Sequence, residues 1–201
     1  MTTNVVGQSK SPGPVLFWGE MYLRRMREEW PNERLAVVFD IDDTALVDSP
    51  QRPMPEFERL YHLARDLKYS IFFVTARVDM QDNTALTKQQ LLENGFGHFD
   101  DLFMMPAEYL PHPNFSLYKY KMRQALHDSG YNIVLNAGDT WHDLMLLPPW
   151  QTRASHIAKI NQLMDSVPRK DYIIFQPPDL AWMAVKFPER FHPASASDLL
   201  V

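Results

Sequence analysis

The sequence predicts an α/β fold in which helices cover both faces of a parallel sheet. Apolar runs of strand length recur along the 201 residues and alternate with segments of helical spacing, as in chains built from consecutive strand–helix–strand units. Each run is almost entirely apolar, which is typical of strands that are buried on both faces. Together these two observations favour a three-layer, Rossmann-like architecture.

Five apolar runs are predicted to be strands, and helices are predicted between them where apolar residues recur every three or four positions. Pro31 stops the first helix, whereas Gly95 and Gly130 end the third and the fourth. The predicted strands are Leu35–Ile41, Ser70–Thr75, Asp101–Met105, Asn132–Ala137 and Tyr172–Phe175. The predicted helices are Val15–Trp30, Glu56–Leu67, Thr84–Asn94, Leu117–Ser129 and Ala154–Met164.

The chain is predicted to form a single domain. Most of its 16 prolines fall in the connections between elements, where they mark loop boundaries without separating a second domain. We expect an N-terminal segment with one helix over residues 1–34, a core over 35–187 and a peripheral tail over 188–201.

Composition excludes several chemistries. Because the chain has no cysteine, it cannot form a disulfide, a thiolate zinc site, an iron–sulfur cluster or a cysteine nucleophile, so any metal must be held by oxygen or imidazole. A net charge of -5 argues against a stable nucleic-acid partner bound through backbone charge. With no leader-like N-terminus and no run of about 18 apolar residues, we expect a cytoplasmic protein without membrane contact.

Reactive side chains follow three of the predicted strands. The first run ends in Asp40 and Asp42, the second in Thr75 and Arg77, and the fourth in Gly138-Asp139-Thr140-Trp141-His142-Asp143. Ligands of open parallel sheets bind beyond the carboxyl ends of the strands. The acids could instead cap the helices that follow. However, the expected number of chance occurrences of Asp-x-Asp-x-Thr together with Gly-Asp-x-x-x-Asp in a chain of this composition is only roughly 0.002. We therefore favour a shared site.

Crowded carboxylates without a thiol or a histidine cage indicate a hard cation, since they would otherwise repel one another. Oxygen ligands with few dedicated protein contacts suit Mg²⁺, and Mg²⁺ in turn indicates a phosphate substrate. Phosphomonoester hydrolysis is among the slowest uncatalysed reactions, so its catalyst needs positioning, charge neutralisation and usually a covalent intermediate. An aspartate that attacks phosphorus supplies such an intermediate, an aspartyl-phosphate.

The same residues resemble the haloacid dehalogenase (HAD) superfamily, and most closely its acid phosphatase branch, which is related to plant vegetative storage proteins and to bacterial class B and class C acid phosphatases. Asp40-Ile41-Asp42-Asp43-Thr44 is similar to motif I, Val74-Thr75-Ala76-Arg77 to motif II, and Gly138-Asp139-Thr140-Trp141-His142-Asp143-Leu144 to motif IV. Motif III is a single lysine, for which Lys119 and Lys121 are candidates; the branch's pattern of a lysine followed four residues later by an arginine favours Lys119 with Arg123. The resemblance covers most of the chain and implies a HAD-type core.

The resemblance implies catalytic roles for four residues. Asp40 would be the nucleophile and a Mg²⁺ ligand. Asp42 would protonate the leaving oxygen, then activate water, and would offer its main-chain carbonyl to the metal. Thr75 and Lys119 would hold the phosphoryl oxygens. With an acid at the position of Asp42, the sequence resembles phosphatases and phosphomutases rather than dehalogenases or ion-pumping ATPases.

The resemblance also implies that Asp139 ligates Mg²⁺ and that Asp143 supports it. Three further residues are candidates for contact with the substrate. Arg77 follows the motif II threonine closely, although an ordinary solvated arginine is an equal alternative. Arg123 belongs to the lysine–arginine pattern, and Trp141 stands beside the expected metal ligand.

The spacing of the motifs leaves no room for a large cap domain. About thirty residues separate Thr44 from Thr75, and about forty-four separate Thr75 from Lys119. The site is therefore expected to be open, with water excluded by a large substrate, by a neighbouring subunit of a homo-oligomer or by the N-terminal segment.

These observations predict a Mg²⁺-dependent phosphatase of nucleotides or other small phosphomonoesters. Two alternatives stay open. The first is a phosphatase of a macromolecular end, such as a nucleic-acid 3′-phosphate or a phosphoprotein, which an open site would permit. The second is a non-catalytic storage or binding protein on the same fold. The presence of Asp40 disfavours the second, since the resemblance implies that the storage relatives have lost the nucleophile.

Overall fold

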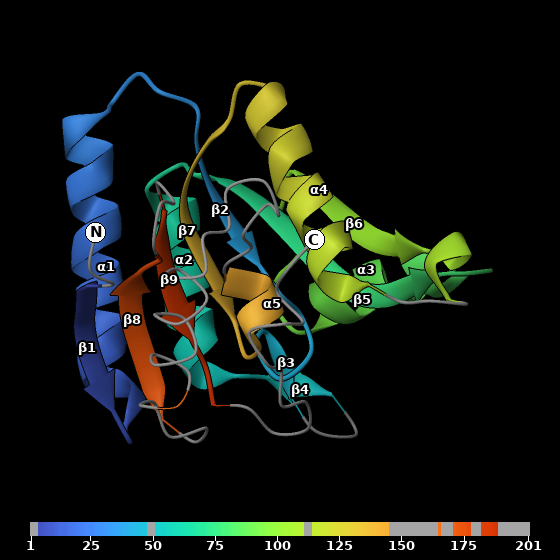
Figure 1. The fold of residues 1–201 in the computed structure, drawn as a ribbon, viewed down its shortest axis with the longest axis horizontal. Helices are drawn as coiled ribbons and strands as arrows, with labels where there is room; N and C mark the ends of the chain where they lie inside the picture. Colours follow the sequence, from blue (N-terminus) through green and yellow to red (C-terminus); the bar gives the residue numbers. More distant parts are fainter. Residues whose placement is uncertain are drawn as a thin grey trace.

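A computed structural model describes residues 4–47, 51–110, 114–144, 165, 171–177 and 182–188. Its centre is a seven-stranded sheet in the order β1-β8-β9-β7-β2-β5-β6 (Figure 1). These strands are β1 (Asn4–Ser9), β2 (Leu35–Phe39), β5 (Ser70–Asp79), β6 (Asp101–Pro106), β7 (Asn132–Gly138), β8 (Tyr172–Gln176) and β9 (Met183–Lys186). The neighbours from β9 to β6 in this order all pair in parallel.

The mostly parallel sheet confirms the predicted fold class, with one correction. The fifth predicted strand is present as β8, but it pairs antiparallel with both β1 and β9. Only residues 177–182 connect β8 to β9. Parallel neighbours need a crossover of a dozen residues or more, whereas antiparallel neighbours need only a short loop. Strands β1 and β9, which flank β8 in the sheet, were not predicted.

The helices lie close to their predicted positions. They are α1 (Pro12–Glu29), α2 (Pro55–Asp66), α3 (Asn83–Glu93), α4 (Phe115–Asp128) and the short α5 (Trp141–Leu144), with a 3₁₀ turn at η1 (Ala107–Tyr109). Prolines occupy the first turn of α1 and α2, where no backbone hydrogen bond is lost. Gly95 and Gly130 follow α3 and α4 with φ of 87° and 83°, a conformation that favours glycine. The predicted helix Ala154–Met164 lies outside the described residues.

Helices pack on both faces of the sheet and divide its apolar side chains into two clusters. On one face, α1 and α2 cover the larger cluster, in which the ring of Phe57 meets that of Phe39 edge-on at 4.8 Å between centroids. On the other face, α4 covers a smaller cluster that includes Val38 and Tyr118. Phe39 and Val38 are neighbours that point to opposite faces, as in any strand. Burial on both faces therefore fixes β2, so that Asp40 emerges at its carboxyl end.

The N-terminal segment joins the same sheet, because β1 pairs with β8 and Gln8 donates a hydrogen bond to Asp171 at 2.9 Å. Within the described residues, only the hairpin of β3 (Leu46–Val47) and β4 (Arg52–Pro53) and helix α2 lie between β2 and β5, which is too little for a large cap. Among the helices that the structure describes, none combines the length and the apolar character needed to cross a bilayer.

Candidate active site

Three buried carboxylates meet at the carboxyl ends of two neighbouring strands. Asp40 directly follows β2, and Asp139 directly follows β7. The backbone N–H of Asp40 donates to the carbonyl of Ala137 at 3.0 Å, which holds the two strand ends together. Asp143 lies on α5, one turn beyond Asp139. One carboxylate oxygen from each acid lies within 4.8 Å of the others.

Lys119 places a positive charge in this cluster from the other side. It lies on α4 with only 5% of its side chain exposed, and its Nζ donates to Asp40 Oδ1 at 2.7 Å and also to Asp143 Oδ1. Lys121 points elsewhere, since its Nζ donates to the hydroxyl of Tyr109 at 3.3 Å on the exposed side of the helix. Of the two candidate lysines, Lys119 is therefore the one that the structure brings to the carboxylates.

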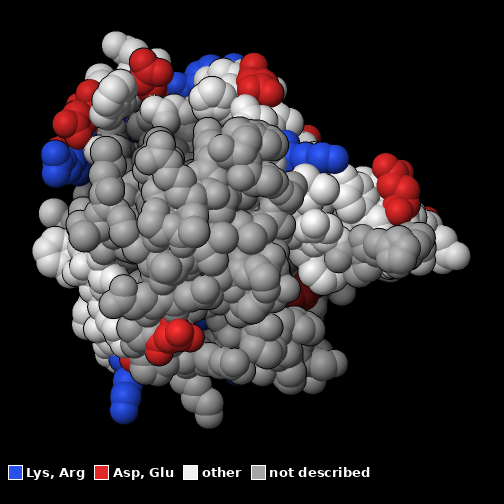
Figure 2. Space-filling model, in the orientation of Figure 1, with Lys and Arg blue, Asp and Glu red and all other residues white. Residues whose placement is uncertain are grey.

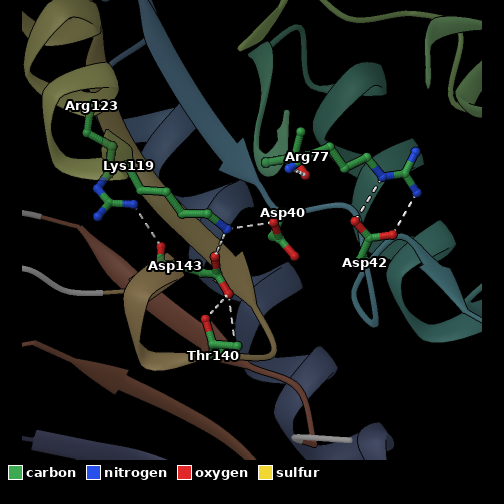
Figure 3. A network of polar contacts seen from close by, with 8 residues as sticks. Asp40, Asp42, Arg77, Lys119, Arg123, Thr140 and Asp143 are labelled. Carbon is green, nitrogen blue, oxygen red and sulfur yellow. Dashed lines mark hydrogen bonds and ion pairs between the residues drawn. The ribbon is translucent and has the colours of Figure 1, made fainter. Parts of the chain in front are cut away.

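Asp143 is held in place through its side chain and through its main-chain carbonyl (Figure 3). Its Oδ2 accepts hydrogen bonds from the backbone N–H of Thr140 at 2.9 Å and from the Thr140 hydroxyl at 2.7 Å. Its main-chain carbonyl accepts a hydrogen bond from Arg123 Nη1 at 3.0 Å. These bonds fix the short helix α5 against α4, and they give Thr140 a structural part that sequence reasoning missed.

Gly138 allows this close approach of α5 to β7. A Cβ atom at this position would overlap Asp143 Cβ and come within 2.5 Å of Asp143 Cγ. We expect Gly138→Ala to displace Asp143, to lower the free energy of unfolding by about 1–3 kcal/mol and to lower more than tenfold the phosphate release that the sequence predicts.

Urea unfolding and phosphate release measure the two effects of Gly138→Ala. Gly13→Ala is the matched control, because a Cβ at Gly13 in α1 meets nothing within 4 Å. Equal stability and activity of the two variants would contradict this role of Gly138.

Asp42 lies apart from the carboxylate cluster. Its side chain is 52% exposed and accepts two hydrogen bonds from Arg77, from Nε at 2.8 Å and from Nη2 at 2.6 Å. Thr75 is buried, and its hydroxyl accepts a hydrogen bond from the backbone N–H of Arg77 at 3.2 Å. The carboxylate partner of Arg77 in this structure is thus Asp42, a contact that the sequence did not indicate.

The cluster carries more negative charge than Lys119 neutralises. Burial, and next the charge of Asp143, raise the pKa of Asp40 to about 7 although Lys119 opposes the shift. Burial and the neighbouring Asp143 and Asp40 raise the pKa of Asp139 to about 9. Burial acts to raise the pKa of Asp143, but the charge and hydrogen bond of Lys119, together with the hydrogen bonds from Thr140, outweigh it and keep that pKa below the usual value. Three buried oxygen donors with excess negative charge fit a hard divalent cation.

The remaining candidate residues are buried away from open solvent. Burial lowers the pKa of Arg123 to about 10, and its guanidinium lies over the ring of Trp182 at 5.8 Å. Trp141 is 3% exposed, meets Phe175 edge-on at 5.7 Å and lies beneath Lys186 Nζ. Trp141 packs in the protein core and Arg123 contacts Asp143 and Trp182, and the contact of either residue with a substrate stays a prediction.

Comparison with known proteins places this chain in a family. Residues 49–165, more than half of the chain, match the family described as HAD superfamily, subfamily IIIB (acid phosphatase). The chain belongs to this HAD subfamily.

The HAD IIIB chain is similar to two stem glycoproteins of Glycine max. It is 32% identical over 92 residues both to a stem 28 kDa glycoprotein and to a stem 31 kDa glycoprotein. The matched segment covers 46% of this chain but only 35% and 31% of those proteins, so the chain spans about a third of the length of these curated relatives.

The HAD IIIB fold is also seen in solved structures of the class C acid phosphatase from Bacillus anthracis. One covers 93% of this chain and 85% of the other chain, with a TM-score of 0.60 and 13% identity. Another, with tungstate bound, covers 92% and 86%, with a TM-score of 0.59 and 13% identity. The similarity covers more than nine-tenths of this chain and confirms the HAD-like α/β fold.

Proposed function

We propose that this HAD IIIB protein is a Mg²⁺-dependent phosphomonoester hydrolase that acts through an aspartyl-phosphate on Asp40. The observation that carries the proposal is the meeting of Asp40 with Lys119 beside two further buried carboxylates. Such an arrangement offers a nucleophile, a compact positive charge and a set of oxygen donors for a cation within one buried site.

In this proposal the carboxylates of Asp40 and Asp139 would hold Mg²⁺, with Asp143 in support and the main-chain carbonyl of Asp42 as a further ligand. Bound Mg²⁺ would neutralise charge on the phosphoryl group during its transfer. Lys119 would bind a phosphoryl oxygen with the Nζ that now contacts two carboxylates, and the Thr75 hydroxyl would bind another. Together these groups would orient phosphorus in line with Asp40.

The reaction proceeds in two steps on these side chains. A carboxylate oxygen of Asp40 forms a bond to phosphorus while the bond from phosphorus to the leaving oxygen breaks, and Asp42 gives that oxygen a proton. Water then attacks the aspartyl-phosphate and passes a proton to Asp42, which restores Asp40 and releases phosphate. The protons given and taken by Asp42 balance over the cycle.

The substrate class in this proposal is nucleotides or other small phosphomonoesters. On the described part of the face in Figure 2, Lys and Arg side chains are interspersed with Asp and Glu rather than gathered in one basic patch. Interspersed charges give little attraction for a nucleic-acid backbone.

The absence of a large cap among the described residues favours the second candidate, a phosphatase of a macromolecular end, because such a substrate needs an open site.

Removal of the metal tests the proposal directly. We expect the full chain to release phosphate in Mg²⁺ and to lose at least about 100-fold of that activity in chelator, since the metal supplies several kcal/mol of charge stabilisation. The assay compares a nucleoside monophosphate, a sugar phosphate, a phosphopeptide and a 3′-phosphorylated oligonucleotide. Highest turnover on either of the last two would select the macromolecular candidate, and inactivity on all four with Mg²⁺ bound would overturn both.

A further inference from the structure

We propose that Arg77 is a positioning residue that sets the orientation of the Asp42 carboxyl, and that it does not bind the phosphoryl group of the substrate. This inference rests on the proposed function, in which Asp42 gives and takes the proton. It adds a residue to the working site and assigns helix α3 a part in catalysis.

The backbone of β5 is shaped to direct Arg77 toward Asp42. Thr75 lies opposite Met104 of β6, but the next paired residue is Val78, opposite Met105. Two extra residues, one of which is Arg77, therefore bulge from the ladder. Bulges beside functional sites redirect a side chain that regular pairing would send elsewhere.

The guanidinium of Arg77 has its hydrogen-bond donors committed on two sides. Nε and Nη2 bind the two oxygens of Asp42 side by side, at 2.8 and 2.6 Å, which is the paired geometry that only arginine offers to a carboxylate. Nη1 donates to Gln90 Oε1 on α3 at 2.6 Å and lies 3.4 Å from the hydroxyl of Thr87. The Arg77 side chain is only 16% exposed, whereas the Asp42 side chain that it holds is 52% exposed.

These bonds tie Asp42 to α3 through Arg77. The Asp42 side chain is half-exposed. Among the described residues, its carboxyl also accepts a hydrogen bond from Gln51 Nε2 at 3.4 Å. A carboxyl with that freedom would sample several orientations, whereas proton transfer needs the carboxyl within hydrogen-bond reach of the leaving oxygen. An ionised carboxyl has about four lone-pair positions, so the two bonds from Arg77 leave others for the proton. Figure 3 shows the guanidinium of Arg77 directed at Asp42 and away from Lys119 and Asp143.

The inference predicts a dependence on the leaving group. p-Nitrophenol leaves readily without a proton, whereas an alkyl alcohol needs one from Asp42 as the bond to phosphorus breaks. In Arg77→Met, kcat/KM for an alkyl phosphate should fall about 100-fold, the lower end of what a general acid contributes, and kcat/KM for p-nitrophenyl phosphate should fall less than tenfold. The inhibition constant of inorganic phosphate should stay within about twofold, because phosphate binding is untouched.

Gln90 gives a second variant that acts through Arg77 alone. Gln90→Leu removes the acceptor of Nη1 and should shift the leaving-group dependence in the same direction by a smaller amount, whereas Gln90→Glu keeps an acceptor and should restore it. Matched controls are Gln89→Leu on the exposed side of α3 and Arg25→Met on α1, where the side chain is 75% exposed.

An equal fall of kcat/KM for both substrates, with a raised inhibition constant for phosphate, would assign Arg77 to substrate binding and overturn the inference. Unchanged kinetics in Arg77→Met would also overturn it. Neither outcome affects the proposed function as long as the wild-type chain hydrolyses both esters. An inactive wild-type chain removes the proposed function, and the inference with it.

Discussion

Asp40→Asn is expected to lower turnover by at least about 10⁴-fold, because an amide cannot form the aspartyl-phosphate, and loss of a nucleophile costs this much or more in enzymes of covalent mechanism. The fold should survive. Burial and the neighbouring Asp143 raise the pKa of Asp40, which means that its negative charge is unfavourable there, and Lys119 keeps its contact with Asp143.

Steady-state phosphate release and acid-quench trapping of labelled phosphoenzyme measure this effect. Wild-type protein should yield a labelled, acid-stable intermediate, and Asp40→Asn should yield none while its melting temperature stays equal or rises. Asp66→Asn is the control, since Asp66 is an exposed acid on α2. More than a tenth of wild-type turnover in Asp40→Asn would rule out Asp40 as the nucleophile.

Lys119→Met is expected to be the most destabilising substitution in the site. Removing one partner of a buried ion pair leaves an uncompensated charge, which costs about 3–5 kcal/mol of unfolding free energy. Here two carboxylates, Asp40 and Asp143, would lose their shared counter-charge. Saturating Mg²⁺ should recover part of the loss, because a cation that binds only the folded protein stabilises it.

Urea unfolding in chelator and in Mg²⁺ measures both parts of this prediction. Lys121→Met provides a control two positions along the same helix. Since the Lys121 side chain lies at the exposed side of α4, where it contacts Tyr109, this change should stay within about 0.5 kcal/mol. If the two variants lost equal stability, the central charge of Lys119 would not be what holds the cluster together.

The parts of the site that follow strands were predictable from the sequence. Asp40, Thr75 and Asp139 each stand at or just after a buried apolar run, and carboxyl ends of neighbouring parallel strands necessarily meet at one edge. The preference for Lys119 over Lys121 came from a pattern of resemblance, and the structure brings Lys119 to Asp40. These residues are specified by local sequence together with one rule of topology.

The contacts that were not predicted depend on long-range geometry. Arg77 meets Asp42 because β5 bulges, and no local pattern reveals which residue a bulge redirects. Gln90 has an ordinary place in a helical pattern, so nothing in the sequence distinguishes it from Gln89. The direction of β8 is set by its pairing with β1 and β9, which no local pattern reveals.

The pairing of β1 with β8 sets the earliest time at which this edge of the sheet can form. Gln8 and Asp171, which hydrogen-bond beside this pair, are 163 positions apart in the chain. At a ribosomal rate of about 5–20 residues per second, roughly 8 to 33 seconds pass between the synthesis of the two. During that interval β1 lacks its partner β8, so this edge of the sheet forms only after β8 has been synthesised. Mutations in β1 should therefore change the yield of folded protein in the cell more than they change the chemistry of the carboxylate site in the folded protein.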